Sequence, residues 1–138
     1  MKPSDVSVII PALNEESRIE DAVRSAWLNG CGQVVVSDGG SSDQTVKRAE
    51  QAGATIVVGP PGRGMQLRRG AEFADRDYLL FLHADNRLGD QSVSQLCRQV
   101  ASRPATQVVW GGFRQKIAAS GLLFRVVEWG NGIRIRVR

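Results

Sequence analysis

The sequence is poor in the residues that build metal clusters, disulfide frameworks and membrane spans. Its 138 residues include two cysteines, Cys31 and Cys97, and one histidine. The two cysteines do not have the spacing of metal ligands, so neither a disulfide framework nor a zinc site made from His and Cys is expected. No segment approaches the ~20 apolar residues that a membrane-spanning helix needs.

Two familiar N-terminal motifs are also missing. The long apolar stretch of a signal peptide is interrupted early by Pro3, Ser4 and Asp5, so we expect a cytoplasmic, reduced setting. The turn after the first expected strand reads Pro11-Ala12-Leu13-Asn14-Glu15 and contains no glycine. That argues against the G-x-G-x-x-G turn of nicotinamide- or flavin-binding folds, and no P-loop is present either.

The composition is that of one globular domain with a modest basic excess. Hydrophobic residues make up 42% and charged residues 23%, and the net charge is +4. This charge favours anionic partners: phosphorylated metabolites, nucleic acid or an acidic membrane surface. Four arginines lie between Arg125 and Arg138. They leave peripheral contact with the inner membrane face open, but they lack the interleaved aromatics of a nucleic-acid site, so no nucleic-acid partner is expected.

Apolar runs alternate with helical patterns along the sequence. Strands are expected at Val6–Ile10 (ended by Pro11), Gln33–Ser37, Thr55–Val58, Tyr78–Leu82 and Val108–Phe113. Helices are expected after an Asn14 N-cap, after Ser41 or Ser42, at Met65–Ala74 and at Gln91–Arg103. The order predicts an α/β fold with a mostly parallel, doubly wound, Rossmann-like sheet and helices on both faces.

Two of these elements carry more detailed expectations. Tyr78 to Leu82 is apolar throughout, which is typical of a fully buried strand. In the helix before it, Leu67, Ala71 and Ala74 share one face.

Polar loops follow three of the expected strands, at Pro11–Glu15, Asp38–Asp43 and His83–Asn86. The carboxyl ends of parallel strands share one edge of a sheet, so these loops should converge. Asp38 can accept hydrogen bonds from a base or a ribose hydroxyl there. Asp85 can hold a divalent cation whose other ligands are diphosphate oxygens and water. The plainer interpretation, that both are ordinary turn residues, stays open at this point.

Four segments together resemble the successive motifs of family-2 glycosyltransferases. They read SVIIPALNEE (7–16), VVVSDGGSSDQT (34–45), GRGMQLRRGA (62–71) and LLFLHADN (79–86). The last is similar to the metal motif of a bacterial subgroup with a His-Ala-Asp core. The resemblance extends from about Ser7 to Phe113.

The resemblance implies a GT-A fold, a nucleoside-diphosphate sugar as donor (a UDP- or GDP-sugar), Mg²⁺ or Mn²⁺ across its phosphates, and transfer with inversion to an acceptor that it does not identify. It further implies that a base and ribose pocket is lined by Pro11, Ala12, Asn14 and Glu15, that Asp38 binds the nucleoside, that Arg63 and Gln66 lie near the base or diphosphate, and that Asp85 coordinates the metal with His83 and Ala84 beside it.

The sequence departs from the family pattern at two places. Asn86 stands where many relatives carry Thr or Asp, so a metal site with a single carboxylate is expected. After Asp90 the one acid is Glu128, in a segment expected to be helical, and we do not assign it as the catalytic base. Losing a general base costs about 10²–10⁴ in rate.

We therefore expect a donor-binding domain at 1–114. The basic, amphipathic segment 115–138 would then begin an incomplete acceptor region, which implies a fold that is truncated at its C-terminal end. The alternative is a catalytically incomplete half-domain that binds donor or self-assembles as a homo-oligomer.

Overall fold

The computed structural model describes residues 1–102 and 111–113. The protein divides into two units, Met1–Arg103 and Pro104–Arg138, and the fold below is that of the first. Gly111 to Phe113, the described part of a predicted strand, belong to neither a helix nor a strand. The rest of that strand and the segment 115–138 lie outside the described residues.

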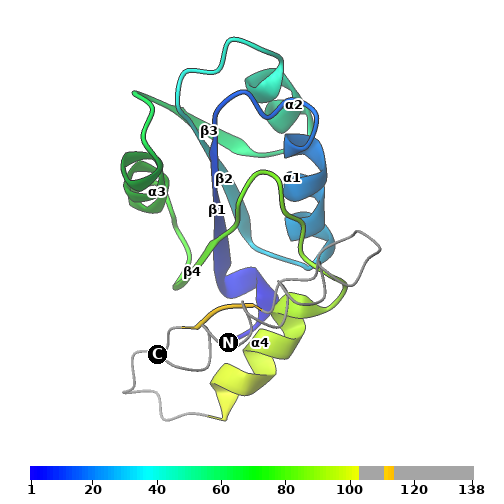
Figure 1. Cartoon of the computed structure of the whole chain (residues 1–138). Helices are drawn as coiled ribbons and strands as arrows, with labels where there is room; N and C mark the ends of the chain where they lie inside the picture. The colour runs from blue at the N-terminus through cyan, green and yellow to red at the C-terminus, as the bar shows by residue number, and fades with distance from the viewer. Residues whose placement is uncertain (103–110, 114–138) are drawn as a thin grey trace, which may run out of the picture. The chain divides into compact units, whose positions relative to one another are not determined.

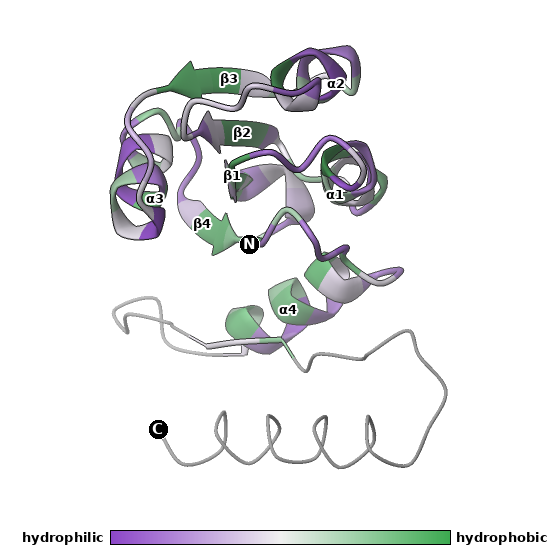
Figure 2. Cartoon of the chain, turned by 45° about the horizontal axis from the view of Figure 1, so that its top comes forward, coloured by the Kyte–Doolittle hydropathy of each residue, from purple (hydrophilic) through white to green (hydrophobic). Residues whose placement is uncertain are grey.

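The first unit alternates strands and helices in the predicted order (Figure 1). Its elements are η1 (Pro3–Asp5), β1 (Val6–Ala12), α1 (Ile19–Leu28), β2 (Gln33–Asp38), α2 (Thr45–Gln51), β3 (Thr55–Val58), α3 (Arg63–Glu72), β4 (Tyr78–Phe81) and α4 (Ser92–Ala101). The strands form a parallel sheet in the order β3-β2-β1-β4. Helices α1 and α2 lie on one side of this sheet and α3 on the other (Figure 2), so the predicted doubly wound α/β fold is confirmed.

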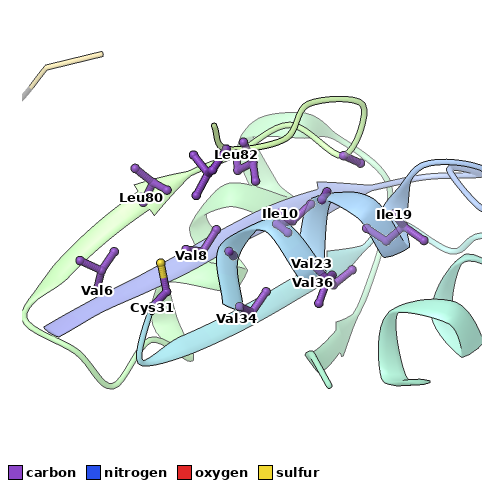
Figure 3. Packing of buried hydrophobic residues seen from close by; sticks show 14 of the residues in the cluster. Val6, Val8, Ile10, Ile19, Val23, Cys31, Val34, Val36, Leu80 and Leu82 are labelled. Atoms are coloured by element: carbon purple, nitrogen blue, oxygen red, sulfur yellow. The ribbon is translucent and has the colours of Figure 1, made fainter. Parts of the chain in front are cut away.

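The alternation of side chains along β1 and β2 divides the core between the two faces of the sheet. Val8, Ile10 and Val36 belong to the larger cluster, which includes Ile19 and Val23 of α1 (Figure 3). The smaller cluster joins Ile9, Val35 and Val57 and has Ala74 packed against it. Because β1 and β2 are buried on both faces, their sequences are almost continuously apolar, as central strands of a parallel sheet require. No helix in the described part of the protein is long and apolar enough to cross a membrane.

The first strand does not end at Pro11, as its sequence suggested, but continues to Ala12. The Ile9 carbonyl accepts a hydrogen bond from Leu82 on the β4 side, whereas the Ala12 carbonyl accepts one from Gly39 on the β2 side. Pro11 is two residues beyond Ile9, so its nitrogen also faces the β4 side of the strand. The last residue of β1 that pairs with β4 is Ile9, so Pro11 lies beyond that pairing. Proline is tolerated because no ladder hydrogen bond is lost there.

Two helices begin later than predicted. Helix α1 begins at Ile19, not after Asn14, and α2 begins at Thr45, not after Ser41 or Ser42. The expected capping side chains instead make hydrogen bonds between the two loops that precede these helices. Short polar side chains serve either purpose, so the local pattern does not distinguish them.

The predicted full burial of Tyr78–Leu82 is wrong. Strand β4 has Leu80 buried, but Leu79 and Phe81 are 46% and 54% exposed. Helix α3 buries residues beside the predicted face. Its buried residues are Gln66 and Gly70, whereas Leu67, Ala71 and Ala74 are partly buried.

Candidate functional site

The three polar loops leave the same edge of the sheet. Ala12 at the end of β1 is in register with Asp38 at the end of β2, and Ile9 is in register with Phe81 of β4. Strands β2 and β4 flank β1, so about 10 Å, two strand spacings, separates their backbones. The edge therefore has Asp38 on one side of β1 and the His83–Asn86 loop on the other, as the β-α pattern predicts.

Asp38 is a buried carboxylate that organises the loop after β2. Its Oδ2 accepts hydrogen bonds from the backbone N–H groups of Gly40 (2.8 Å) and Ser41 (2.9 Å), and its Oδ1 accepts one from the Ser41 hydroxyl. Gly40 has φ +91°, a conformation that glycine adopts without strain. A carboxylate oxygen accepts about two hydrogen bonds, so Oδ1 retains an acceptor position for a further donor.

The loops after β1 and β2 are joined by hydrogen bonds. The Asn14 amide oxygen accepts from the Ser42 backbone N–H at 2.9 Å, and the Asn14 N–H donates to the Ser41 hydroxyl at 2.9 Å. The Glu15 N–H donates to the Thr45 hydroxyl at 2.8 Å. Asn14 itself has φ +55°, which asparagine adopts more readily than most residues. These contacts give the predicted Asn14–Glu15 region a defined backbone beside Asp38.

Asp43 and Glu16 complete this connection. The Glu16 N–H donates to Asp43 Oδ2 at 3.2 Å, and the Gln44 N–H donates to Glu16 Oε2 at 2.9 Å. Asp43 also accepts from the hydroxyl and the backbone N–H of Thr45. The Thr45 hydroxyl bond is the largest of the effects that lower the pKa of the Asp43 carboxyl, because it favours the charged form.

The loop between β3 and α3 approaches the same edge. Arg63, expected in this loop, is the first residue of α3 and is exposed. Gln66, one turn further, is buried, and its side-chain nitrogen donates to the carbonyls of Ala12 (2.8 Å) and Ser37 (3.0 Å). Gln66 is therefore engaged with the strand ends beneath the site.

The His83–Asn86 segment presents polar groups outward on an apolar anchor. Leu82 and Ala84 are buried in the main cluster, whereas His83 and Asp85 are exposed. The Asn86 N–H donates to the His83 carbonyl at 3.0 Å, which closes the turn. Among the residues that the structure describes, the Asp85 carboxylate makes no hydrogen bond or ion pair.

The exposed Asp85 carboxylate fits a cation that is also coordinated by a ligand, rather than a metal site built from protein side chains alone. Within residues 1–102 and 111–113, no group of three or more His, Cys, Asp or Glu side chains could hold a metal ion. Mg²⁺ typically uses one or two carboxylates together with phosphate oxygens and water. The outward-facing Asp85 can supply one such carboxylate.

Sequence reasoning missed two residues that shape this edge. Thr45 is fully buried and binds both Glu15 and Asp43. Arg69 of α3 donates from Nη2 to the Asp38 carbonyl at 3.1 Å. Their signals are weak: Thr45 follows a string of loop residues, and Arg69 stands beside another arginine. The spacing of three from Gln66 does place Arg69 on the same side of a helix.

Fold and candidate site together define a parallel α/β domain with carboxylates at the carboxyl edge of its sheet, and comparison with known proteins identifies its family. The protein-family model described as "Glycosyl transferase family 2" matches residues 7–135. The chain therefore belongs to glycosyl transferase family 2, as its motifs predicted.

Two relatives show how far the similarity extends. Glucosyl-3-phosphoglycerate synthase of Mycolicibacterium smegmatis is 33% identical over 129 residues, covering 84% of this chain and 43% of that protein. Protein RfbJ of Shigella flexneri is 30% identical over 114 residues, covering 81% of this chain and 87% of that protein. The protein thus spans less than half the length of the synthase and most of the length of RfbJ.

Solved structures agree with the fold. Glucosyl-3-phosphoglycerate synthase of Mycobacterium tuberculosis has been solved with Mn²⁺, UDP and phosphoglyceric acid, and also with Mg²⁺ and UDP. Each structure superposes with a TM-score of 0.60 at 31% identity and covers 70% of this chain and 39% of the synthase. The predicted GT-A type of fold is confirmed.

Proposed function

We propose that this protein binds a nucleoside-diphosphate sugar with Mg²⁺ or Mn²⁺ and transfers the sugar to an acceptor, with inversion at the anomeric carbon. The observation that carries the proposal is the placement of Asp38 and Asp85 on either side of β1 at one edge of a family-2 domain. UDP is the preferred nucleotide because the similar mycobacterial synthase is solved with UDP; a GDP-sugar is the alternative.

The residues divide into a nucleoside side and a diphosphate side. Asp38 and the loop Pro11–Glu15 adjoin one another at the ends of β1 and β2, which suits the base and ribose. Asp85 would hold the cation, with His83 and Ala84 beside it. A bound cation would supply positive charge that stabilises the departing diphosphate. Arg63, exposed at the start of α3, can add a second positive charge.

Calorimetry with a matched pair of carboxylates tests donor binding. Asp85 follows the carboxyl end of β4, whereas the exposed Asp77 precedes its amino end, at the opposite edge of the sheet. Asp85→Ala should weaken UDP binding in Mn²⁺ by at least about tenfold, because it removes the protein's carboxylate from the cation. Asp77→Ala should bind as the unchanged protein does. Equal UDP affinity in all three proteins, with and without Mn²⁺, would contradict the proposal.

A second candidate is donor binding without transfer. Inverting transfer needs a carboxylate that deprotonates the acceptor hydroxyl, and the one acid in residues 91–138 is Glu128. UDP release from UDP-glucose, measured with phosphoglycerate and with simple sugars as acceptors, separates the two functions. Metal-dependent UDP binding without acceptor-stimulated UDP release would favour the second candidate.

A further inference from the structure

Two side chains of α3 reach from the helix to the ends of the strands that carry the site. Gln66 is 5% exposed, and both hydrogens of its amide nitrogen are used, one on the Ala12 carbonyl and one on the Ser37 carbonyl. Its amide oxygen accepts from the Gly62 N–H at 3.2 Å. A single side chain thus connects β1, β2 and the residue before Arg63.

Arg69 makes the second connection, at the other end of the same loop. Its Nη2 donates to the carbonyls of Asp38 (3.1 Å) and Pro60 (3.4 Å). The Gly59 N–H also donates to the Asp38 carbonyl, at 3.1 Å. The guanidinium lies so close to Gly59 that a Cβ there would stand 2.1 Å from Nη1. The loop 59–62 is therefore held against the end of β2 at both of its ends.

We propose that Gln66 and Arg69, called here the α3 clamp, are positioning residues for donor binding. They hold the loop 59–62 on the ends of β1 and β2, and so set where Arg63 stands relative to Asp38. This inference rests on the proposed function, in which Arg63 adds positive charge on the diphosphate side of the donor. It differs from the expectation that Gln66 itself lies against the base or diphosphate, since its amide nitrogen has no hydrogen left to donate to a ligand.

A double-mutant cycle distinguishes action through Arg63 from direct contact. The variants are Gln66→Met, Arg63→Met and the double variant, and the measurement is the Kd of UDP in Mn²⁺ by calorimetry. Gln66→Met should weaken binding about tenfold when Arg63 is present, the loss expected from one or two hydrogen bonds that hold the loop. In the Arg63→Met background it should change Kd by less than about twofold, because the two residues act as one unit. Additive losses would overturn the proposal.

The adjacent arginine supplies a matched control for Arg69. Arg68 is exposed and pairs with Glu72 at 2.9 Å on the outer surface of α3. Arg68→Met and Arg69→Met remove the same charge from neighbouring positions. Arg69→Met should weaken UDP binding several-fold, by about the same factor as Gln66→Met, and Arg68→Met should leave it unchanged. Equal losses in both variants would show a general charge effect and overturn the role of Arg69.

Trypsin cleavage tests the clamp without a ligand. If the unchanged protein binds no UDP, the proposed function fails, but the attachment of the loop can still be measured. Gln66→Met should speed cleavage after Arg63 several-fold, while cleavage after Arg87, an exposed arginine in the loop beyond Asp85, keeps its rate. An unchanged rate at Arg63, or equal acceleration at both arginines, would overturn the proposal.

Discussion

At the scale of single residues, the carboxylates at the site edge, which is the edge of the sheet where the loops after β1, β2 and β4 begin, are of two kinds. Asp38 is buried, and both of its oxygens accept hydrogen bonds from its own loop. Asp85 is exposed and has no such bonds within the described residues. The first carboxylate shapes the loop and keeps one acceptor position on Oδ1, whereas both oxygens of the second are available to a ligand. Their sequence contexts, a strand end followed by small or polar residues, do not tell them apart, because burial depends on which elements pack above each loop.

Asp43 links loop structure to pH. The hydrogen bond from the Thr45 hydroxyl is the leading cause that holds the pKa of Asp43 below its ordinary value in the folded protein. A carboxyl with a lowered folded pKa contributes stability above its unfolded pKa of about 3.9, and that stability is lost as the pH falls through the folded pKa. We therefore expect Asp43→Asn to destabilise the protein at pH 7 and to make its stability fall less between pH 5 and pH 2.

Urea unfolding at several pH values measures this prediction. An NMR titration of the Asp43 carboxyl gives the folded pKa directly, and Thr45→Val should raise it by removing the hydroxyl donor. A folded pKa at or above the ordinary value would contradict the assignment.

At the scale of elements, α3 shows how close packing and a polar task share one helix face. Gln66 and Gly70 are its two buried residues, four positions apart. A Cβ on Gly70 would lie 2.4 Å from Ile9 Cγ2. Glycine thus lets α3 approach β1 closely enough for Gln66 to reach the strand carbonyls. The face predicted from Leu67, Ala71 and Ala74 is partly buried. The pattern did not reveal the contact at Gly70, because that contact depends on a missing side chain.

Substitution by alanine is expected to change the stability of the protein in opposite directions at two glycines of α3. Gly70→Ala should destabilise the protein by about 1–3 kcal/mol, since overpacking against Ile9 exceeds the gain in helix propensity. Within the described residues, a methyl group at Gly64 meets no heavy atom within 4 Å beyond its chain neighbours and the backbone of its own helix, so Gly64→Ala should stabilise by up to about 1 kcal/mol. Urea denaturation of both variants measures the two signs. A Gly70→Ala protein as stable as the unchanged one would contradict the close approach of α3 to β1.

The first residues of helices α1 and α2 are also decided by contacts between elements. Asn14, Ser41 and Ser42 are good capping residues, and the sequence places them where caps are expected. In the fold they connect the β1 and β2 loops instead, so α1 and α2 begin later. Whether these side chains cap a helix or join the two loops depends on the partner loop, which is 27 residues away in the sequence.

At the scale of the whole molecule, the central strand β1 supports both the core and the site. Its neighbours β2 and β4 flank it, and its side chains alternate between the two clusters. This arrangement makes the site edge an extension of the best-buried part of the fold. Loss of packing against β1 should therefore lower the free energy of unfolding.

Ile10→Ala tests this role. Ile10 is fully buried in the larger cluster, so removing most of its side chain should lower the free energy of unfolding by about 2–5 kcal/mol. Leu28→Ala is the control, because Leu28 is 87% exposed and its loss should change stability by less than about 0.5 kcal/mol. Thermal and urea unfolding of both variants measure the difference. Equal effects at the two positions would contradict the assigned core.

The sequence by itself determined the α/β class, the succession of β-α units along the chain, the parallel sheet that they imply, the family and the edge at which the acids gather. These follow from local apolar periodicity and from motifs of adjacent residues. Only the tertiary structure decided that Asp38 is buried and Asp85 exposed, that Asn14 and Ser42 join two loops, and that Gln66 and Arg69 clamp a third. The physical reason is that hydrogen-bond partners and burial depend on which distant segments the sheet brings together.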